Sequence, residues 1–199
     1  MQSLDDTFKD LLARLKQGRT LGGTGTDPIY YLVFPVTELL SVKRKTTAWK
    51  GQLQNQGYEV VECSMHKLVR DTLLNHKQRR FWLEGEKFAL RSSTGQTDGI
   101  QTKQIATTLA SALAEGPEVI QAVLECLEDA NSRTNGLLLL TDLEAIHPFL
   151  RINSIEAQLH GKVRCPVVVL YPGLRDGRTS LRFLGFYPPD PNYRSEHLG

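Results

Sequence analysis

The sequence predicts an α/β fold: a mostly parallel open sheet of about four to five strands flanked by helices, with a C-terminal antiparallel edge strand. Strand-like and helix-like segments alternate after residue 28. Two uninterrupted apolar runs, 136–141 and 166–171, have the composition of buried central strands. The chain has 199 residues, 40% of them hydrophobic, which suits a single domain over 1–199.

The N-terminal segment has the pattern of an amphipathic helix. Ser3 is a good N-cap, with Asp6 placed as in a capping box, and leucines then recur at helical spacing. Gly18 is expected to end this helix. After a glycine-rich connector, the apolar run 29–34 between two prolines predicts the first buried strand.

A second helix and strand follow. Helical spacing over 37–56 predicts a helix, 58–63 reads as a strand, and a short helix is expected to begin near Ser64. The stretch 77–99 fits neither period well. Its two short alternating apolar stretches indicate a small hairpin or an irregular excursion.

The C-terminal half supplies the remaining elements. Apolar residues from Ile105 to Leu113 mark one helix, and Pro117 opens another. The segment 142–160 between the two apolar strands has helical character interrupted near Pro148. The run 180–186 follows a turn region, which predicts a hairpin to an antiparallel edge strand, and 188–199 is expected to be a tail.

The composition argues against several classes of protein. No stretch reaches the roughly 18 apolar residues of a membrane span, and no signal peptide is seen, so a cytoplasmic location is expected. Three isolated cysteines suggest neither a disulfide framework nor a zinc site, and no cofactor is expected. Phosphate-loop, zinc-protease and nucleophile-elbow motifs are lacking, so no catalytic residue is assigned.

The net charge of +2 hides an uneven distribution. Residues 43–91 hold eleven Lys or Arg against five acids, a local excess of +6. Within them, Arg79 and Arg80 precede Phe81 and Trp82, a combination of phosphate-seeking charge and stacking aromatics. These four residues are candidate partner contacts. The alternative function is direct nucleic-acid binding through 43–91. The alternative without any binding function is that these residues are a solvated helix end followed by aromatic residues of the core.

Parallel sheets bind ligands at the carboxyl ends of their strands. That edge is expected to collect Thr141, Asp142, Tyr171 and Gly173 as a candidate pocket. Alternatively, Thr141 and Asp142 cap the following helix, because Asp at a helix start already has a structural role.

The C-terminal region supplies further candidate partner contacts. Pro172 and Gly173 can turn the chain so that Arg175 and Arg178 point away from the sheet. Tyr193 and Arg194 are of residue types that often dominate interfaces. The alternative is that this tail packs on its own domain.

Four short segments of the C-terminal half carry a resemblance to a known family: 141–151, 169–173, 181–185 and 190–194. They resemble the Pro-Phe-Leu-Arg, Tyr-Pro-Gly, Leu-Phe-Gly and closing Asn-Tyr-Arg blocks of the BrxB family of BREX phage-resistance systems. The stretch 77–99 matches no block.

The resemblance implies a place in a multi-protein defence system that includes a DNA methyltransferase, a large ATPase and a PglZ-type phosphatase-like protein. It implies a non-catalytic adaptor or assembly component that contacts the PglZ-type protein and other BREX components, with possible DNA contact inside the complex and no membrane partner.

Overall fold

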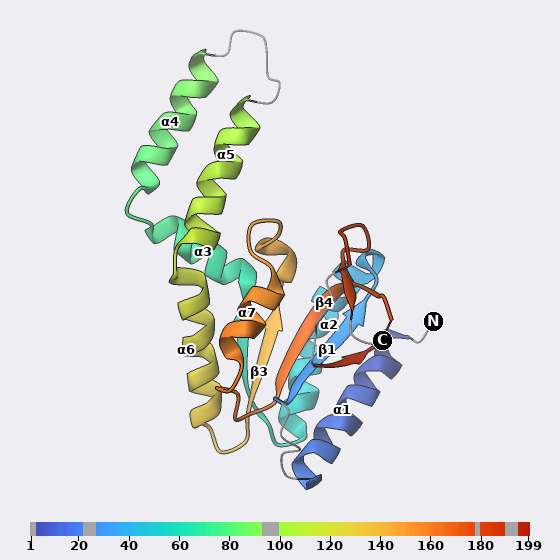
Figure 1. Ribbon diagram of the computed structural model, residues 1–199. Helices are drawn as coiled ribbons and strands as arrows, with labels where there is room; N and C mark the ends of the chain where they lie inside the picture. The colour runs from blue at the N-terminus through green and yellow to red at the C-terminus, as the bar shows by residue number, and fades with distance from the viewer. Residues whose placement is uncertain (1–2, 22–26, 93–99, 178–179, 190–194) are drawn as a thin grey trace.

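The computed structural model describes residues 3–21, 27–92, 100–177, 180–189 and 195–199 (Figure 1). In chain order the elements are α1 (Leu4–Leu21), β1 (Ile29–Phe34), η1 (Val36–Glu38), α2 (Leu39–Asn55), β2 (Glu59–Ser64), α3 (Met65–Asn75), α4 (Arg79–Ser92), α5 (Ile100–Ala110), η2 (Ser111–Glu115), α6 (Glu118–Ser132), β3 (Gly136–Thr141), η3 (Leu143–Ala145), α7 (Ile152–Leu159), β4 (Val167–Arg175), β5 (Leu181–Phe183) and β6 (Glu196–Leu198). The fold is therefore α/β, as the sequence predicts.

Five strands form one parallel sheet in the order β2-β3-β4-β1-β6. The central pairs are long and regular, with Tyr31 opposite Val169 and Cys63 opposite Leu140. The short strand β5 pairs with the end of β4 and runs antiparallel to it, with Phe183 opposite Gly173. The antiparallel hairpin expected near residue 181 is thus confirmed.

Two details of the expected sheet are wrong. Six strands lie in the described part of the chain instead of four to five, and the C-terminal strand, β6, is parallel to its neighbour β1. The tail predicted over 188–199 contains this strand. Because β6 is only three residues long and follows three prolines, its sequence shows no alternation to detect. Its pairing covers the otherwise open edge of β1.

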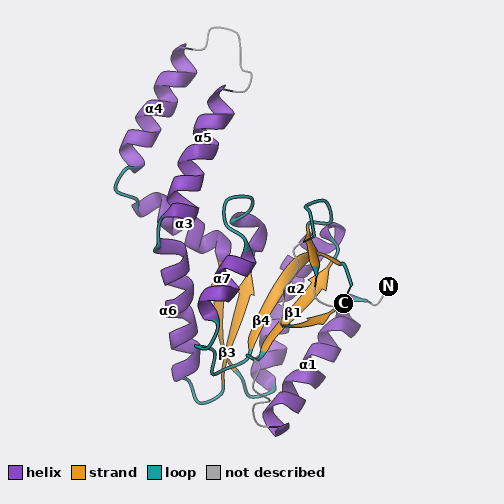
Figure 2. Cartoon of the chain, viewed as in Figure 1, coloured by secondary structure: helices purple, strands orange, loops and turns teal. Residues whose placement is uncertain are grey.

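Helices cover both faces of the sheet (Figure 2). Helices α1 and α2 pack on one face, where Leu32 and Leu139 point, while α3, α6 and α7 pack on the other, where Tyr31 and Leu138 point. Successive strand residues point to opposite faces. Continuous apolar runs such as 136–141 are therefore buried along their whole length, as expected for central strands of this fold.

The prediction of a small hairpin or an irregular excursion over 77–99 is wrong for the described residues of that stretch, because Arg79–Ser92 forms the helix α4. Helix α4 lies beside α5, and the two extend past the carboxyl ends of the strands (Figure 1). A helix satisfies its own backbone hydrogen bonds, so α4 needs no partner strand where it leaves the sheet. We refer to α4 and α5 as the helical hairpin.

Local hydrogen bonds explain two helix starts. Ser3 Oγ accepts from the backbone N–H of Asp6, and its hydroxyl donates to the Asp6 carboxylate at 2.6 Å. Ser64 ends β2 and caps α3 by accepting from the N–H of Lys67. Helix α1 continues past Gly18, which was expected to end it, to Leu21.

Candidate functional site

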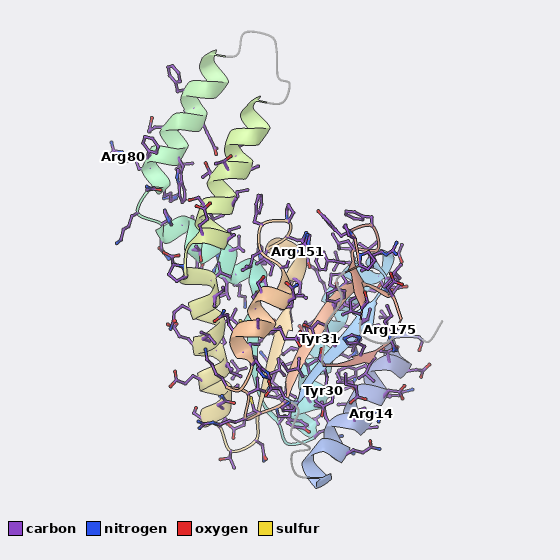
Figure 3. All side chains as sticks on the ribbon, viewed as in Figure 1. Arg14, Tyr30, Tyr31, Arg80, Arg151 and Arg175 are labelled. Carbon is purple, nitrogen blue, oxygen red and sulfur yellow. The ribbon has the colours of Figure 1, made fainter. Side chains whose placement is uncertain are left out.

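The helical hairpin carries four of the candidate partner contacts. Arg79, Arg80 and Phe81 are exposed, and Phe81 keeps 77% of its surface open to solvent. Trp82 instead turns toward the body of the protein, where it packs against the core and stacks on His76 with ring centroids 4.1 Å apart. Figure 3 shows Arg80 on the side of α4 away from the sheet.

A second aromatic residue extends this surface along α4. Phe88 is 73% exposed and lies two helical turns after Phe81, so both side chains are on the same side of the helix. Gly85 lies between them with nothing within 4 Å of the position that a Cβ would occupy. Two exposed phenylalanines and an open glycine therefore form a stripe along one side of α4.

An open groove of about 340 Å³ runs between the two helices of the hairpin. It is lined by Phe81, Trp82, Gly85, Glu86, Thr107, Thr108 and Ser111. Glycine, threonine and serine are small enough to let another backbone approach closely, and the two aromatic rings supply apolar contact area.

Much of the positive charge over 43–91 is paired locally. Five of these cations form ion pairs with nearby acids, namely Lys43, Lys45, Lys50, Arg70 and Lys87. Arg79 and Arg80 form no ion pair within the described part of the chain. Exposed cations elsewhere in this stretch, Arg44, Lys67 and Lys77, likewise form no ion pair within the described residues.

A polar cluster lies at the carboxyl ends of β2 and β3. The hydroxyls of Ser64 and Thr141 both donate to Asp142 Oδ2, at 2.6 and 3.2 Å. Lys43 of α2 reaches Asp142 Oδ1 at 3.0 Å and also pairs with Glu144. We call these five residues the strand-end cluster.

Burial and hydrogen bonding act in opposite directions on Asp142. Burial raises the pKa of this carboxyl, but hydrogen bonds from Ser64 and Lys43 lower the pKa. Together with the charge of Lys43 they outweigh burial, so the pKa of Asp142 lies below its usual value. Burial likewise lowers the pKa of Lys43, and its hydrogen bonds to Glu144 and Asp142 reverse the effect and raise it. Both partners are therefore ionised around neutral pH.

Asp142 occupies the position before η3 but does not cap it with its side chain. The carboxylate instead accepts from Ser64 and Thr141, while the backbone adopts a left-handed conformation with φ of 58°. Non-glycine residues seldom adopt this conformation, so the surrounding contacts must hold it in place. Of the two interpretations of Asp142, capping through the side chain is excluded.

The four residues of the expected strand-end pocket do not meet. Thr141 and Asp142 line a hollow under α2, together with Lys43. Tyr171 points to the opposite face of the sheet, where it makes edge contacts with Tyr31 and Phe183. Gly173 lies where β4 pairs with β5. Side chains of a strand alternate between the two faces of the sheet, so Tyr171 is separated from Thr141 and Asp142 by the sheet itself.

The remaining candidate contacts are near the C-terminus. Arg175 is exposed, and its guanidinium donates to the backbone oxygen of Gly199 at 3.3 Å (Figure 3). Arg178, Tyr193 and Arg194 lie outside the described residues. Sequence reasoning did not include Lys43 in the strand-end site, because only the tertiary fold brings α2 beside β3.

Within the described residues, no group of three or more His, Cys, Asp or Glu side chains is placed to hold a metal ion. Burial raises the pKa of the Cys165 thiol, opposite to what an activated nucleophile needs. In the same described part, no helix is long and apolar enough to cross a membrane.

Comparison with known families gives one match. The family model described as BREX protein BrxB matches residues 82–198, more than half of the chain. The matched region begins inside α4 and includes every strand from β3 to the last. Searches of curated proteins and of solved structures found no match.

Proposed function

Because the chain belongs to the BrxB family and is thus a component of a BREX phage-resistance system, we propose that it is a non-catalytic adaptor in the cytoplasm. It binds a PglZ-type phosphatase-like protein and holds it to other components of the system. The helical hairpin is the element that makes this contact.

One observation carries the proposal: Phe81 and Phe88 are 77% and 73% exposed on a helix that extends beyond the sheet. Exposing two large aromatic rings to water is unfavourable, by about 25 cal/mol for each Å² of apolar surface. Aromatic residues are also enriched in the energetically dominant parts of protein interfaces. A partner that covers this stripe removes the unfavourable exposure.

Co-purification from cells that express the whole system tests the proposal. The double variant Phe81→Glu with Phe88→Glu is expected to lose the PglZ-type partner and phage protection while keeping its melting temperature. Leu40→Glu is the matched control, since Leu40 is also exposed, at 66%, but lies on α2. Retention of the partner by the double variant, or capture of no BREX component by the unmodified chain, would refute the hairpin contact.

Direct nucleic-acid binding is the second candidate, favoured by Arg79 and Arg80, which lie beside the exposed Phe81. The local ion pairs of Lys43, Lys45 and the other paired cations weaken it, because paired cations release fewer counterions from DNA. A mobility-shift titration at two salt concentrations distinguishes the two functions. No shift at low salt would exclude direct binding, and a shift that Arg79→Ala with Arg80→Ala abolishes would favour it.

A further inference from the structure

The groove between α4 and α5 has room for a side chain of another protein. Its volume of about 340 Å³ is at the lower end of the range of about 300–1,000 Å³ in which pockets enclose a bound group. On the α4 side it is lined by the rings of Phe81 and Trp82. Nothing lies within 4 Å of the position that a Cβ would take at Gly85. An apolar side chain can therefore lie against both rings and over the glycine.

The α5 side of the groove is polar and made of small residues. Thr107 and Thr108 belong to α5, and Ser111 begins the following element, η2. Hydroxyl groups both donate and accept hydrogen bonds. The N–H and C=O groups of a polypeptide need such partners when they leave water. The groove thus combines apolar contact for a side chain with hydrogen-bonding groups for the main chain that carries it.

Opposite charges mark two points along the groove. Arg79 lies three residues before Trp82 and seven before Glu86, so the three residues are on one side of α4. Arg79 is exposed and forms no ion pair within the described residues, whereas Glu86 lines the groove itself. About 10 Å of helix separates the two charges, at 1.5 Å per residue. A carboxylate of a bound segment is therefore favoured at the Arg79 end and disfavoured beside Glu86.

These charges favour a polypeptide over a nucleic acid as the occupant. A single strand can stack its bases on aromatic rings, but every nucleotide carries a phosphate. A strand lying along the groove would place negative charge beside Glu86 as well as beside Arg79. A polypeptide can carry a carboxylate at one position and neutral residues at the next.

We propose that this groove binds a segment of the partner protein in which an apolar side chain lies between Trp82 and Gly85 and a nearby carboxylate pairs with Arg79. The inference rests on the proposed function, because it specifies the chemistry of the hairpin contact. The point midway between Trp82 and Gly85 is about 7 Å along the helix from Arg79. Two residues of extended chain span about that distance. One residue therefore separates the acidic from the apolar residue in the bound segment.

Chemical-shift titration of the full ¹⁵N-labelled chain with short peptides tests this chemistry. Acetyl-Asp-Ala-Phe-Ala-amide and acetyl-Ala-Phe-Ala-Asp-amide offer the required spacing in the two chain directions. At least one of them is expected to shift the amide signals of Trp82 and Gly85, and to bind about fivefold more tightly than its Asn counterpart. Equal binding of the Asp and Asn peptides, or no shift with either direction, would overturn the proposal. Tighter binding of single-stranded oligothymidylate at the same amides would also overturn it.

A groove-filling substitution tests where the apolar side chain lies. Gly85→Leu is expected to weaken peptide binding about tenfold or more, because it occupies the space of the apolar side chain. Gly51→Leu in α2 is the matched control, since nothing lies within 4 Å of its Cβ position either. Leucine is a better helix former than glycine, so both variants should keep or raise the melting temperature. Unchanged peptide binding by a folded Gly85→Leu variant would contradict the proposal.

Two neighbouring arginines test the position of the carboxylate. Arg79→Glu is expected to abolish the preference for the Asp peptide over the Asn peptide. Arg80→Glu is the matched control and should keep the preference, because Arg80 lies on the side of α4 away from the sheet and is not among the residues that line the groove (Figure 3). Equal effects of the two substitutions would show a general attraction to positive charge and overturn the pairing with Arg79.

Co-purification with the whole partner separates this inference from the hairpin contact on which it rests. Gly85→Leu is expected to retain less partner than Gly51→Leu. Equal retention by these two variants, together with loss of the partner in the Phe81→Glu, Phe88→Glu variant, would leave the hairpin contact standing and overturn the groove. Retention of the partner by all three variants would refute the hairpin contact and the groove together.

Discussion

The sheet and the helical hairpin use their apolar residues in opposite ways. Leu138 of β3 is fully buried between helices on one face, and its neighbours point into an equally buried layer on the other. On α4, by contrast, Trp82 packs against the core, while Phe81 and Phe88 are largely exposed. Apolar side chains are thus buried throughout the sheet, whereas two large aromatic side chains of the hairpin stay largely exposed.

The largest expected effect comes from a charge placed between the helices and the sheet. Leu138→Asp buries an unpaired carboxylate and should destabilise the fold by more than about 4 kcal/mol, so that little soluble protein forms. Leu40→Asp, at an exposed position of α2, is the control and should remain soluble. A soluble Leu138→Asp variant with a cooperative thermal transition would contradict the burial of β3.

A smaller steric effect is expected where β4 meets β5. A Cβ at Gly173 would lie 2.4 Å from the backbone oxygen of Arg182 and 2.6 Å from the ring of Tyr171, so Gly173→Ala should destabilise the protein by about 3 kcal/mol. Gly51→Ala in α2 meets nothing within 4 Å and should stabilise the helix by about 1 kcal/mol. Urea unfolding of both variants measures the contrast, and equal effects would argue against the close pairing of β4 with β5.

The hairpin itself offers a comparison of adjacent residues. Trp82→Ala removes the stack on His76 and the contact with the core, and should cost about 2 kcal/mol because the side chain is only partly buried. Phe81→Ala should change stability by less than about 0.5 kcal/mol, since its side chain is exposed. Hydrogen exchange of the α4 amides is the measurement. Faster exchange is expected for Trp82→Ala alone, and similar rates in both variants would show that Trp82 does not anchor the hairpin.

The difference in burial between the sheet and the hairpin also bears on which elements can be predicted from the sequence. Buried strands such as β3 and β4 were predictable because both faces are covered, which leaves a continuous apolar run in the sequence. Helix α4 was missed although its apolar residues recur at helical spacing, because the short apolar stretches around Trp82 and Phe88 were interpreted as the alternation of a strand. Strand β6 was missed because three residues carry too little pattern.

The candidate sites were predictable only in part. The carboxyl edge of the sheet was expected to collect Thr141 and Asp142, and there Asp142 accepts a hydrogen bond from Ser64, since the ends of parallel strands meet at that edge. Lys43, which pairs with Asp142, is about a hundred residues away in the sequence, and hydrophobic periodicity does not predict contacts between such distant residues.

The smallest expected effect concerns the strand-end cluster and depends on pH. Because the pKa of Asp142 is lowered in the folded protein, ionisation of this carboxyl stabilises the fold above its unfolded pKa of about 3.9, and the contribution is lost as the pH falls through the folded value. Lys43, whose pKa is raised, loses its contribution only as the pH rises through its own folded value, above about 10.4. Between these limits the pair contributes a constant amount.

Asp142→Asn should therefore lower the free energy of unfolding by about 1 kcal/mol at pH 7, because the hydrogen bonds from Ser64 and Lys43 lose their charge. The difference from the unmodified protein should shrink as the pH falls below about 4, toward the lower pKa at which Asp142 becomes neutral in the folded protein. Asp176→Asn is the control, since its partner Arg182 and its own carboxylate are both exposed, and it should change stability little at any pH. A difference for Asp142→Asn that persists unchanged at low pH would show that the cluster stabilises the sheet edge through the shape of the side chain and not through its charge.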